Sequence, residues 1–594
     1  MSHAVAIRQA RLQPEYADAT RAAKVRGKPR RLIDSPHSAG LSVNPLSASC
    51  WARLFAFAAA LVAIKLWLIQ DLSPLLLADA MYDDGLFLRL ARSISLGEWL
   101  GPFDHRTLIK GSFFSIWLAI VNAAGIPFVW AQSLLMASAA LTAAAVWLRL
   151  GMTPVASLAG LVLLVFHPVT VSDFLLRASR ELLYAVETLL VVIGLTAVAA
   201  RGSTWRSWLA TGAALAPFWL TREEGIWILP AIGIALALRF APGLRTNSWT
   251  VLKQGSACVA LIAVVPLLAN QAVRHANQAK YGVAVATEFR ADYFNEAFGA
   301  IQRVKPDVER RYVPMARSAR EKAYAASPAF SSLRRHLEIS HSGWFSPCIY
   351  IDPCDDYSSH FVWAFREAIV LEGKYRSLSE SRRFYRQLST EINEACSTGE
   401  LDCHGPHGSV RPIMHASDIP HVFESFWESV AFVALGGELR TRNHAALGTP
   451  AQIGKAAAFL HHAELGRPAT PLSSAGEARA AILDAIHPIF KLLFLIGIPA
   501  GSILWAARGL TTRRTPSRWL GPVAIVVTAL LSRSGMLAVV DATAFDGVNA
   551  HYHAPSFVLV AVLFVLILAT ATDGDETLRA TASRLRKAIW TRRT

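Results

Sequence analysis

Apolar runs of about twenty residues recur along this chain, and they constrain its fold more than any other feature. A helix of about twenty apolar residues is long enough to cross the hydrocarbon core of a bilayer. Over the whole chain, 53% of residues are hydrophobic and 17% are charged, a balance typical of integral membrane proteins. We therefore predict an all-α polytopic membrane protein with about ten spans, near 51–70, 128–149, 154–172, 182–200, 207–220, 225–240, 251–270, 486–507, 519–540 and 554–571.

The basic residues are distributed as in the cytoplasmic connectors of such a protein. The formal net charge is +16, but the arginines gather in short connectors and at both ends of the chain, which argues against nucleic acid as a partner. With both termini in the cytoplasm, the connectors that fall inside carry residues such as Arg149, Arg201 and Arg239. Those that fall outside, 71–127 and 541–549, are rich in acids. The charge pattern predicts a multi-pass protein of a bacterial-type inner membrane.

These alternations divide the chain into parts. We expect a disordered basic cytoplasmic tail at 1–50, a transmembrane module at 51–270 whose first external loop is 71–127, C-terminal spans at 486–572 and a basic cytoplasmic tail at 573–594. The apolar run GSFFSIWLAIVNAAGIPF at 111–128 would invert every later connector if it crossed the bilayer. We therefore expect an interfacial or shallow re-entrant helix there.

The stretch 271–485 has ordinary soluble composition and falls on the outer, periplasmic side. Its helical signals are clear in SLSESRRFYRQLSTEINEACSTG, where Ser377 and Glu380 have capping-box spacing and Gly399 follows as a stop. We expect a mainly helical extracytoplasmic domain. Four cysteines in an oxidising compartment predict disulfides, and we favour local pairing of Cys348 with Cys354 and of Cys396 with Cys403. The alternative is a zinc site that uses His404 or His407, which is disfavoured because the CxxC spacing of structural zinc sites is missing.

Charged residues collect at the outer ends of the apolar runs, where they are costly unless paired, hydrated or used. The segments are YDDG after the first span, a lysine before the 111–128 run, RASRE, TREEG, and DGVNAHYHAP before the last span. The candidate residues are Asp83, Asp84, Lys110, Arg177, Arg180, Glu181, Arg222, Glu223, Glu224, His551 and Tyr552. Since the charge rule places them all on one face, they could line one cavity.

Carboxylates and cations in one cavity suit transfer chemistry on an anionic lipid. A carboxylate can act as general base on an acceptor hydroxyl, and Lys or Arg can hold a phosphate leaving group. Each segment also has a structural interpretation. The acid pair could simply begin a helix, and Lys110 could simply anchor the chain at the membrane interface. The Arg and Glu residues could form internal ion pairs, and His551 and His553 could be packing residues.

The order of these features resembles the GT-C superfamily of polytopic glycosyltransferases. The similar branch holds the protein O-mannosyltransferases and lipid A aminoarabinose transferases, a family 39-like group. There, an acidic pair and an amphipathic helix open the first external loop, as in YDDGLFLRLARSI, and a Lys-containing element leads a short apolar helix, as in TLIKGSFFSIWLAI. A further charged site precedes the fourth span, matched by RASRELLYAVETLL. The resemblance covers about 51–270 and, loosely, the last spans.

The resemblance implies a polyprenyl-phosphate-linked sugar as donor and transfer to an external glycan, lipid or protein. It implies Asp83 as the acceptor-activating base, Asp84 as its neighbour and Lys110 as a ligand of the donor phosphate. The second acidic site would fall at Arg180 and Glu181, where the basic surroundings suggest a phosphate clamp instead. No cofactor is assigned, and a divalent metal ion stays open. The alternative is a transporter or flippase for a lipid-linked glycan, for which repeated halves with broken helices are expected.

Overall fold

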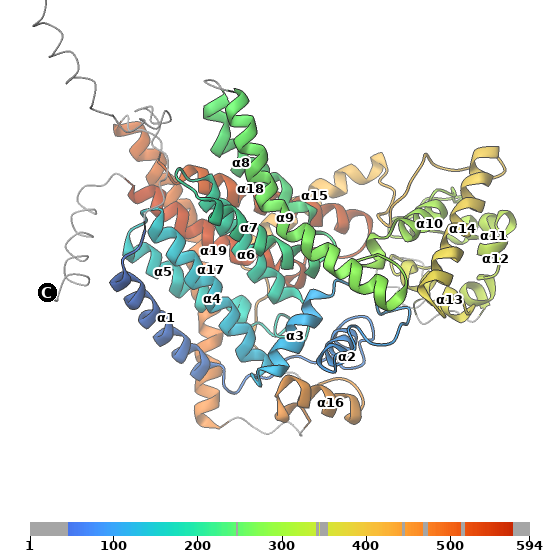
Figure 1. Cartoon of the computed structure of the whole chain (residues 1–594), viewed down its shortest axis with the longest axis horizontal. Helices are drawn as coiled ribbons and strands as arrows, with labels where there is room; N and C mark the ends of the chain where they lie inside the picture. Colours follow the sequence, from blue (N-terminus) through green and yellow to red (C-terminus); the bar gives the residue numbers. More distant parts are fainter. Residues whose placement is uncertain are drawn as a thin grey trace, which may run out of the picture. The chain divides into compact units, whose positions relative to one another are not determined.

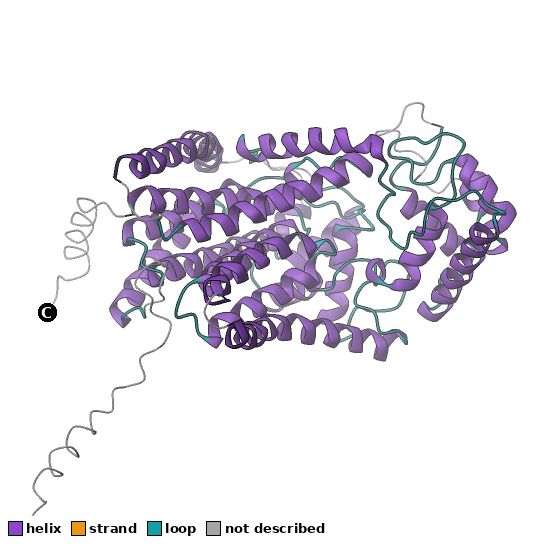
Figure 2. Ribbon diagram, turned by 90° about the horizontal axis from the view of Figure 1, so that it is seen from above, coloured by secondary structure: helices purple, strands orange, loops and turns teal. Residues whose placement is uncertain are grey.

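The computed structural model describes residues 45–244, 248–339, 344, 355–441, 446–466, 473–512 and 517–573. Within these ranges the chain forms α-helices joined by loops and short 3-10 turns, with isolated bridges in place of strands (Figure 2). The predicted all-α architecture is confirmed. Eight helical segments of the described residues are long and apolar enough to cross a membrane: α1 (Ala48–Leu68), α4 (Phe128–Arg149), α6 (Glu181–Ala199), α8 (Leu229–Leu244) together with the 3-10 turn that precedes it from Gly225, α9 (Ser248–Tyr281), α17 (Ser474–Thr512), α18 (Leu520–Thr543) and α19 (Ala550–Thr572).

Two of the predicted spans are helices too short to cross a bilayer by themselves. Helix α5 (Pro154–Val165) has 12 residues, because the chain breaks at His167 and Pro168 into a 3-10 turn. Helix α7 (Trp205–Thr221) has 17 residues. At a rise of 1.5 Å per residue they are about 18 and 26 Å long, less than the hydrocarbon thickness of about 30 Å. The 111–128 run gives α3 (Phe113–Ala123), whose 11 residues are too few to cross, as predicted.

The spans surround a central pair of helices. In α19, 89% of the most apolar window is buried, and in α6 the share is 78%, whereas it is 11% in α9. Helices α6 and α19 pack against each other, and α4, α5, α7, α17 and α18 pack around them (Figure 1). The outer helices therefore expose apolar faces, which is the surface a lipid environment would cover.

Described residues between Val283 and Leu401 form an apolar core together with residues of the 71–127 loop. Its helices are α10 (Asp292–Gln302), α11 (Arg317–Ala326), α12 (Pro328–Ser331), α13 (Phe361–Leu371) and α14 (Leu378–Thr398). Leu86, Leu90 and Ile109 of the loop belong to this core. Two later helices pack elsewhere: α15 (Ile419–Ala434) on α18, and α16 (Pro450–Leu460) on α3 and on α2 (Asp84–Ser95). The predicted domain boundaries stay predictions.

Local signals in the predicted external domain are confirmed. The Ser377 side chain accepts a hydrogen bond from the amide of Glu380 at the start of α14, and Gly399 ends that helix with φ of 79°. Cys396 and Cys403 form the predicted disulfide. Cys348 and Cys354, the other predicted pair, lie outside the described residues.

Candidate active site

The acidic pair lies where the chain leaves the first span and enters α2. Asp84 is fully buried, and both of its carboxylate oxygens are occupied. One accepts a hydrogen bond from the amide of Leu77 at 2.9 Å, and the other from Arg177 Nε at 2.7 Å. The Asp83 side chain is 43% exposed and forms ion pairs with Lys110 and, at 3.7 Å, with Arg177. The structure therefore separates the two acids: Asp83 is open to a ligand, and Asp84 fixes Arg177.

The same neighbours separate the pKa values of the two acids. Burial acts to raise the pKa of Asp83, but Lys110 and then Arg177 outweigh it and hold that pKa below its ordinary value. Burial raises the pKa of Asp84 to about 7, against the opposing effect of Arg177 and the Leu77 amide. Asp83 is consequently ionised at neutral pH and can accept a proton or a hydrogen bond.

Lys110 and Arg180 share the face of one aromatic ring. Lys110 Nζ lies 5.5 Å from the ring centroid of Phe87 in α2, and the Arg180 guanidinium lies 5.9 Å from it. Arg180 forms an ion pair with Glu223 at 2.9 Å, and Glu223 also accepts the amide of Gly111 at 2.7 Å. Glu223 thus joins the residue after Lys110 to the start of α6, which keeps Lys110 and Arg180 near each other.

A second group of charges adjoins the first at the starts of α6 and α19. Glu181 is paired with His551 Nε2 at 2.8 Å and with Arg222 at 3.4 Å. Arg222 is also 2.7 Å from Glu224, and its guanidinium lies 5.3 Å from the Tyr552 ring centroid. Despite the cost of burial, the guanidinium of Arg222 and then that of Arg533 lower the pKa of Glu224 to about 2. Every acid in this group is therefore matched by a cation.

The structure brings together all the residues that the sequence singled out at the predicted outer ends. They come from the loop before α2, the loop before α3, the start of α6, the end of α7 and the start of α19, which meet at one end of the spans. Predicted inner connectors meet at the other ends of their helices: Arg518, before α18, donates to the Gly151 carbonyl after α4 and pairs with Asp573 after α19. The charge rule thus sorted the helix ends correctly relative to one another.

The domain that we predict to be external packs directly on the acidic loop. The Tyr82 ring, one residue before Asp83, lies 4.9 Å from the Trp363 ring, and its hydroxyl donates to Glu367 at 3.1 Å. Arg366, on the same helix α13, donates to the carbonyl of His105 at 2.5 Å. The domain therefore contributes to the conformation of the loop that presents Asp83.

Sequence reasoning missed two arginines of this region. Arg533, in the middle of α18, is fully buried, donates to the Tyr552 carbonyl at 2.8 Å and lies 3.7 Å from Glu224. Arg290 donates to the carbonyls of Arg222 and Glu223, which directly follow α7. A lone arginine in an apolar run was a usable signal for Arg533, because such residues are rare in spans unless paired. No sequence pattern marks Arg290.

The carboxylates of this site face lysine and arginine side chains, so its cations are already supplied by the protein. Among the described residues, the one group of three histidines, aspartates or glutamates whose donor atoms converge lies elsewhere, at Glu309, His404 and His415. A metal-dependent role for the acidic pair stays an expectation.

No protein-family model and no curated protein matches the chain. Two solved structures of ArnT from Cupriavidus metallidurans are similar to it. The apo structure is 12% identical and matches over 92% of this chain and 81% of that one, with a TM-score of 0.29. The structure bound to undecaprenyl phosphate is 14% identical, over 92% and 82%, with a TM-score of 0.30. Likeness with TM-scores this low says nothing more about the chemistry of this chain.

Proposed function

We propose that this chain is an integral membrane glycosyltransferase that moves a sugar from a polyprenyl-phosphate donor to an acceptor outside the cytoplasm. The observation that carries the proposal is one half-exposed carboxylate, Asp83, surrounded by cations from separate loops. A carboxylate that can reach a ligand supplies a base, and the cations beside it supply a site for a phosphate. The order of these residues along the chain also resembles that of GT-C enzymes.

In the proposed reaction, Asp83 removes the proton of an acceptor hydroxyl as its oxygen bonds to the anomeric carbon of the sugar. The bond between that carbon and the phosphate oxygen breaks, and polyprenyl phosphate leaves with the electron pair. Lys110 and Arg177, both within ion-pair distance of Asp83, would take up the developing negative charge. Arg180, beside Lys110 on the Phe87 ring, would extend this phosphate site.

Because Asp83 is paired with Lys110, binding of the donor phosphate would also change the pKa of Asp83. In the resting protein, Lys110 and Arg177 lower the pKa of Asp83 and so weaken it as a base. A bound phosphate would compete for the same cations. The pKa of Asp83 would then rise toward neutrality, and the base would be strongest when the donor is present.

Binding of the donor lipid tests the cationic half of the proposal. The full chain, purified in nanodiscs, would be titrated with undecaprenyl phosphate and analysed by native mass spectrometry. Lys110→Met is expected to weaken binding by at least about tenfold, the effect of losing one charge-assisted contact of about 1.4 kcal/mol or more. Lys305→Met, which removes an exposed lysine of the external domain, is the matched control. Equal binding by the wild type and Lys110→Met would contradict the assignment.

Asp83→Asn tests the base. Envelope lipids and glycans would be compared by mass spectrometry in cells that make the wild type, Asp83→Asn or no protein. Loss of a general base typically costs about 10²- to 10⁴-fold in rate, so the Asn variant should resemble the cells without protein. Asp79→Asn, an exposed acid in the same loop, is the control. Normal amounts of product with Asp83→Asn would contradict the proposal. Movement of the intact lipid-linked sugar across the membrane of proteoliposomes would instead favour the transporter.

A further inference from the structure

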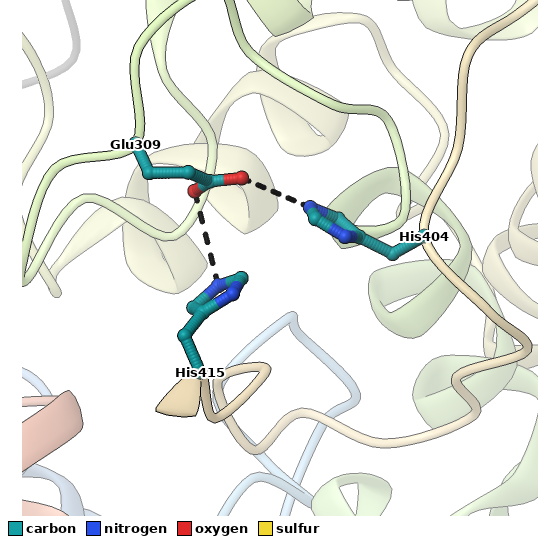
Figure 3. Close-up of side chains that lie close together, drawn as sticks. All are labelled: Glu309, His404 and His415. Carbon is teal, nitrogen blue, oxygen red and sulfur yellow. Dashed lines mark hydrogen bonds and ion pairs between the residues drawn. The ribbon is translucent and has the colours of Figure 1, made fainter. Parts of the chain in front are cut away.

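A second cluster of side chains lies in the external domain, away from the acidic pair. Glu309 is in the loop between α10 and α11, His404 follows the disulfide cysteine Cys403, and His415 precedes α15. Figure 3 shows the two imidazoles facing the carboxylate from different segments of the chain. The proposed transfer reaction uses none of these residues.

The donor atoms of the cluster are close enough to share one ion. His404 Nε2 is 2.9 Å from one carboxylate oxygen of Glu309, and His415 Nε2 is 3.8 Å from the other. All three ligand atoms lie within 4.8 Å of one another. Ligands of a tetrahedral zinc ion, each about 2.0 to 2.2 Å from the metal, are separated by distances somewhat shorter than this, so a small side-chain movement would suffice.

Hydrogen bonds of their backbone amides hold the two histidines in place. Cys396 and Cys403 close a short loop immediately before His404, whose amide donates to the Arg303 carbonyl at 2.7 Å. The amide of His415 donates to the Asp418 carboxylate at 2.8 Å. Glu309, by contrast, has a 51% exposed side chain. The cluster is thus an ordered pair of imidazoles facing a carboxylate that can adjust to a ligand.

The chemistry of this donor set selects a class of metal. Two imidazoles and one carboxylate are ligands for zinc and similar transition metals, whereas magnesium and calcium prefer oxygen donors. The three residues line a cavity of about 340 Å³, which leaves room for water at a fourth position. The nearby arginines are directed elsewhere: Arg310 pairs with Asp355 at 2.5 Å, and Arg311 donates to the Ala542 carbonyl at 2.9 Å.

Two interactions compete with metal binding. The hydrogen bond between His404 and Glu309 would be exchanged for metal bonds. The His415 side chain also caps the backbone of Asp418, and metal binding at Nε2 would require the proton on the other ring nitrogen and so give up that cap. Each loss is one hydrogen bond. A tightly bound zinc ion supplies much more, because its binding energy contributes directly to folding.

We propose that Glu309, His404 and His415 form a zinc-type metal site that fastens the external domain to the membrane helices. The ion would join the loop after α10, the disulfide loop and the segment that enters α15. Two of these segments already touch the end of α18: Tyr312 donates to the Asp541 carbonyl, and Ser425 of α15 donates to the Asp541 carboxylate. The metal thus closes a ring of contacts among three segments at one helix end.

Zinc binding to the purified full chain tests this proposal. After removal of metals with a chelator, the chain in detergent is titrated with Zn²⁺ by calorimetry, and bound zinc is counted by elemental mass spectrometry. The wild type should take up one tight equivalent and unfold at a higher temperature with zinc. Glu309→Gln, His404→Ala and His415→Ala should each bind at least about tenfold more weakly. His407→Ala, at a partly exposed histidine whose ring bonds to the Arg411 carbonyl, should match the wild type.

The outcomes separate a metal site from a simple hydrogen-bonded cluster. X-ray absorption at the zinc edge should show nitrogen and oxygen neighbours at about 2.0 to 2.2 Å. Glu309→Gln is expected to fold even if a histidine variant misfolds, because the Glu309 side chain is exposed, so metal binding can still be tested. The proposal is overturned if the wild type shows no saturable zinc, or if the His404→Ala/His415→Ala double variant keeps its zinc and the same zinc-dependent unfolding temperature.

Discussion

Two regions of this protein use ion pairs in opposite ways. In the external domain, Arg366 is fully buried against Glu288, which is 1% exposed, at 2.7 Å. Arg320, also 1% exposed, is enclosed between Asp356 and Glu338 at 2.6 Å. At the outer helix ends, Asp83 stays 43% exposed although Lys110 and Arg177 contact it. These buried pairs of the external domain leave no room for a ligand, whereas the carboxylate of Asp83 stays open to one although it is paired.

This difference distinguishes a structural ion pair from a candidate catalytic one. A fully buried, or closed, ion pair has no side-chain atom accessible to a ligand, and removing one member leaves the other as a buried charge without a partner of opposite charge. An open pair can exchange one partner for a ligand, because water already reaches it. Openness, rather than the number of charged residues, is therefore the property that marks Asp83.

The largest expected effect is on the closed pair. Arg366→Met should lower the free energy of unfolding by about 3–5 kcal/mol, because Glu288 would remain buried and unpaired. Lys110→Met should cost less, since Asp83 would keep both Arg177 and access to water. Denaturant titration in detergent micelles measures both values.

Controls for this prediction come from the same domain. Lys305→Met disrupts an exposed pair with Asp402 and should cost about 0–1 kcal/mol. The double variant Arg366→Met/Glu288→Leu should recover much of the loss, because it removes both buried charges. If Lys110→Met destabilises the chain as much as Arg366→Met, the distinction between open and closed pairs fails.

A smaller effect is expected at Gly111, which brings the backbone after Lys110 against the end of α7. A Cβ atom there would lie 2.0 Å from the Leu220 carbonyl oxygen, so Gly111→Ala must displace the loop and its hydrogen bond to Glu223. We expect a loss of about 1–3 kcal/mol in unfolding free energy and weaker binding of undecaprenyl phosphate.

The matched control for Gly111 is Gly233→Ala in α8. Nothing lies within 4 Å of the Cβ atom that this substitution adds, and alanine favours a helix interior. Its stability should equal or slightly exceed that of the wild type. Unchanged lipid binding by Gly111→Ala would show that the position of Lys110 does not depend on this contact.

The sequence predicted the membrane helices and the clustering of charges, because both follow from simple physical costs. Apolar length predicted the spans, and the positive-inside rule sorted their ends, which placed Asp83, Lys110, Arg180, Glu181 and His551 together. Neither rule contains distances. The sequence could not show that Asp84 turns inward to the Leu77 amide, since that contact depends on the irregular loop before α2.

The external domain was predictable only in part, for the same reason. Caps, periodicity and local cysteine spacing act over a few residues, and they predicted α14 and the Cys396–Cys403 disulfide. The packing of Trp363 on Tyr82 and the cluster of Glu309 with His404 and His415 join residues far apart in the sequence. Long-range contacts of this kind carry no local signature. They are where sequence reasoning stopped.

A last expected effect is a pH dependence that separates the two acids themselves. Burial raises the pKa of Asp84 in the folded protein to about 7, whereas a carboxyl of this type in an unfolded chain titrates near 3.9. Between these values the folded state holds the extra proton. The wild type should therefore lose stability relative to Asp84→Asn as the pH rises from about 4 to about 7, with little further change above. For Asp83→Asn the change of stability with pH should have the opposite sign, because Lys110 and Arg177 lower the pKa of Asp83. The wild type should lose stability relative to this variant as the pH falls through the range where the Asp83 carboxylate takes up its proton. Unfolding temperatures of the three proteins from about pH 2 to about pH 8 decide the matter. Curves for Asp84→Asn and Asp83→Asn that move in the same direction would mean that the two acids share one environment and that Asp83 is not the open member of the pair.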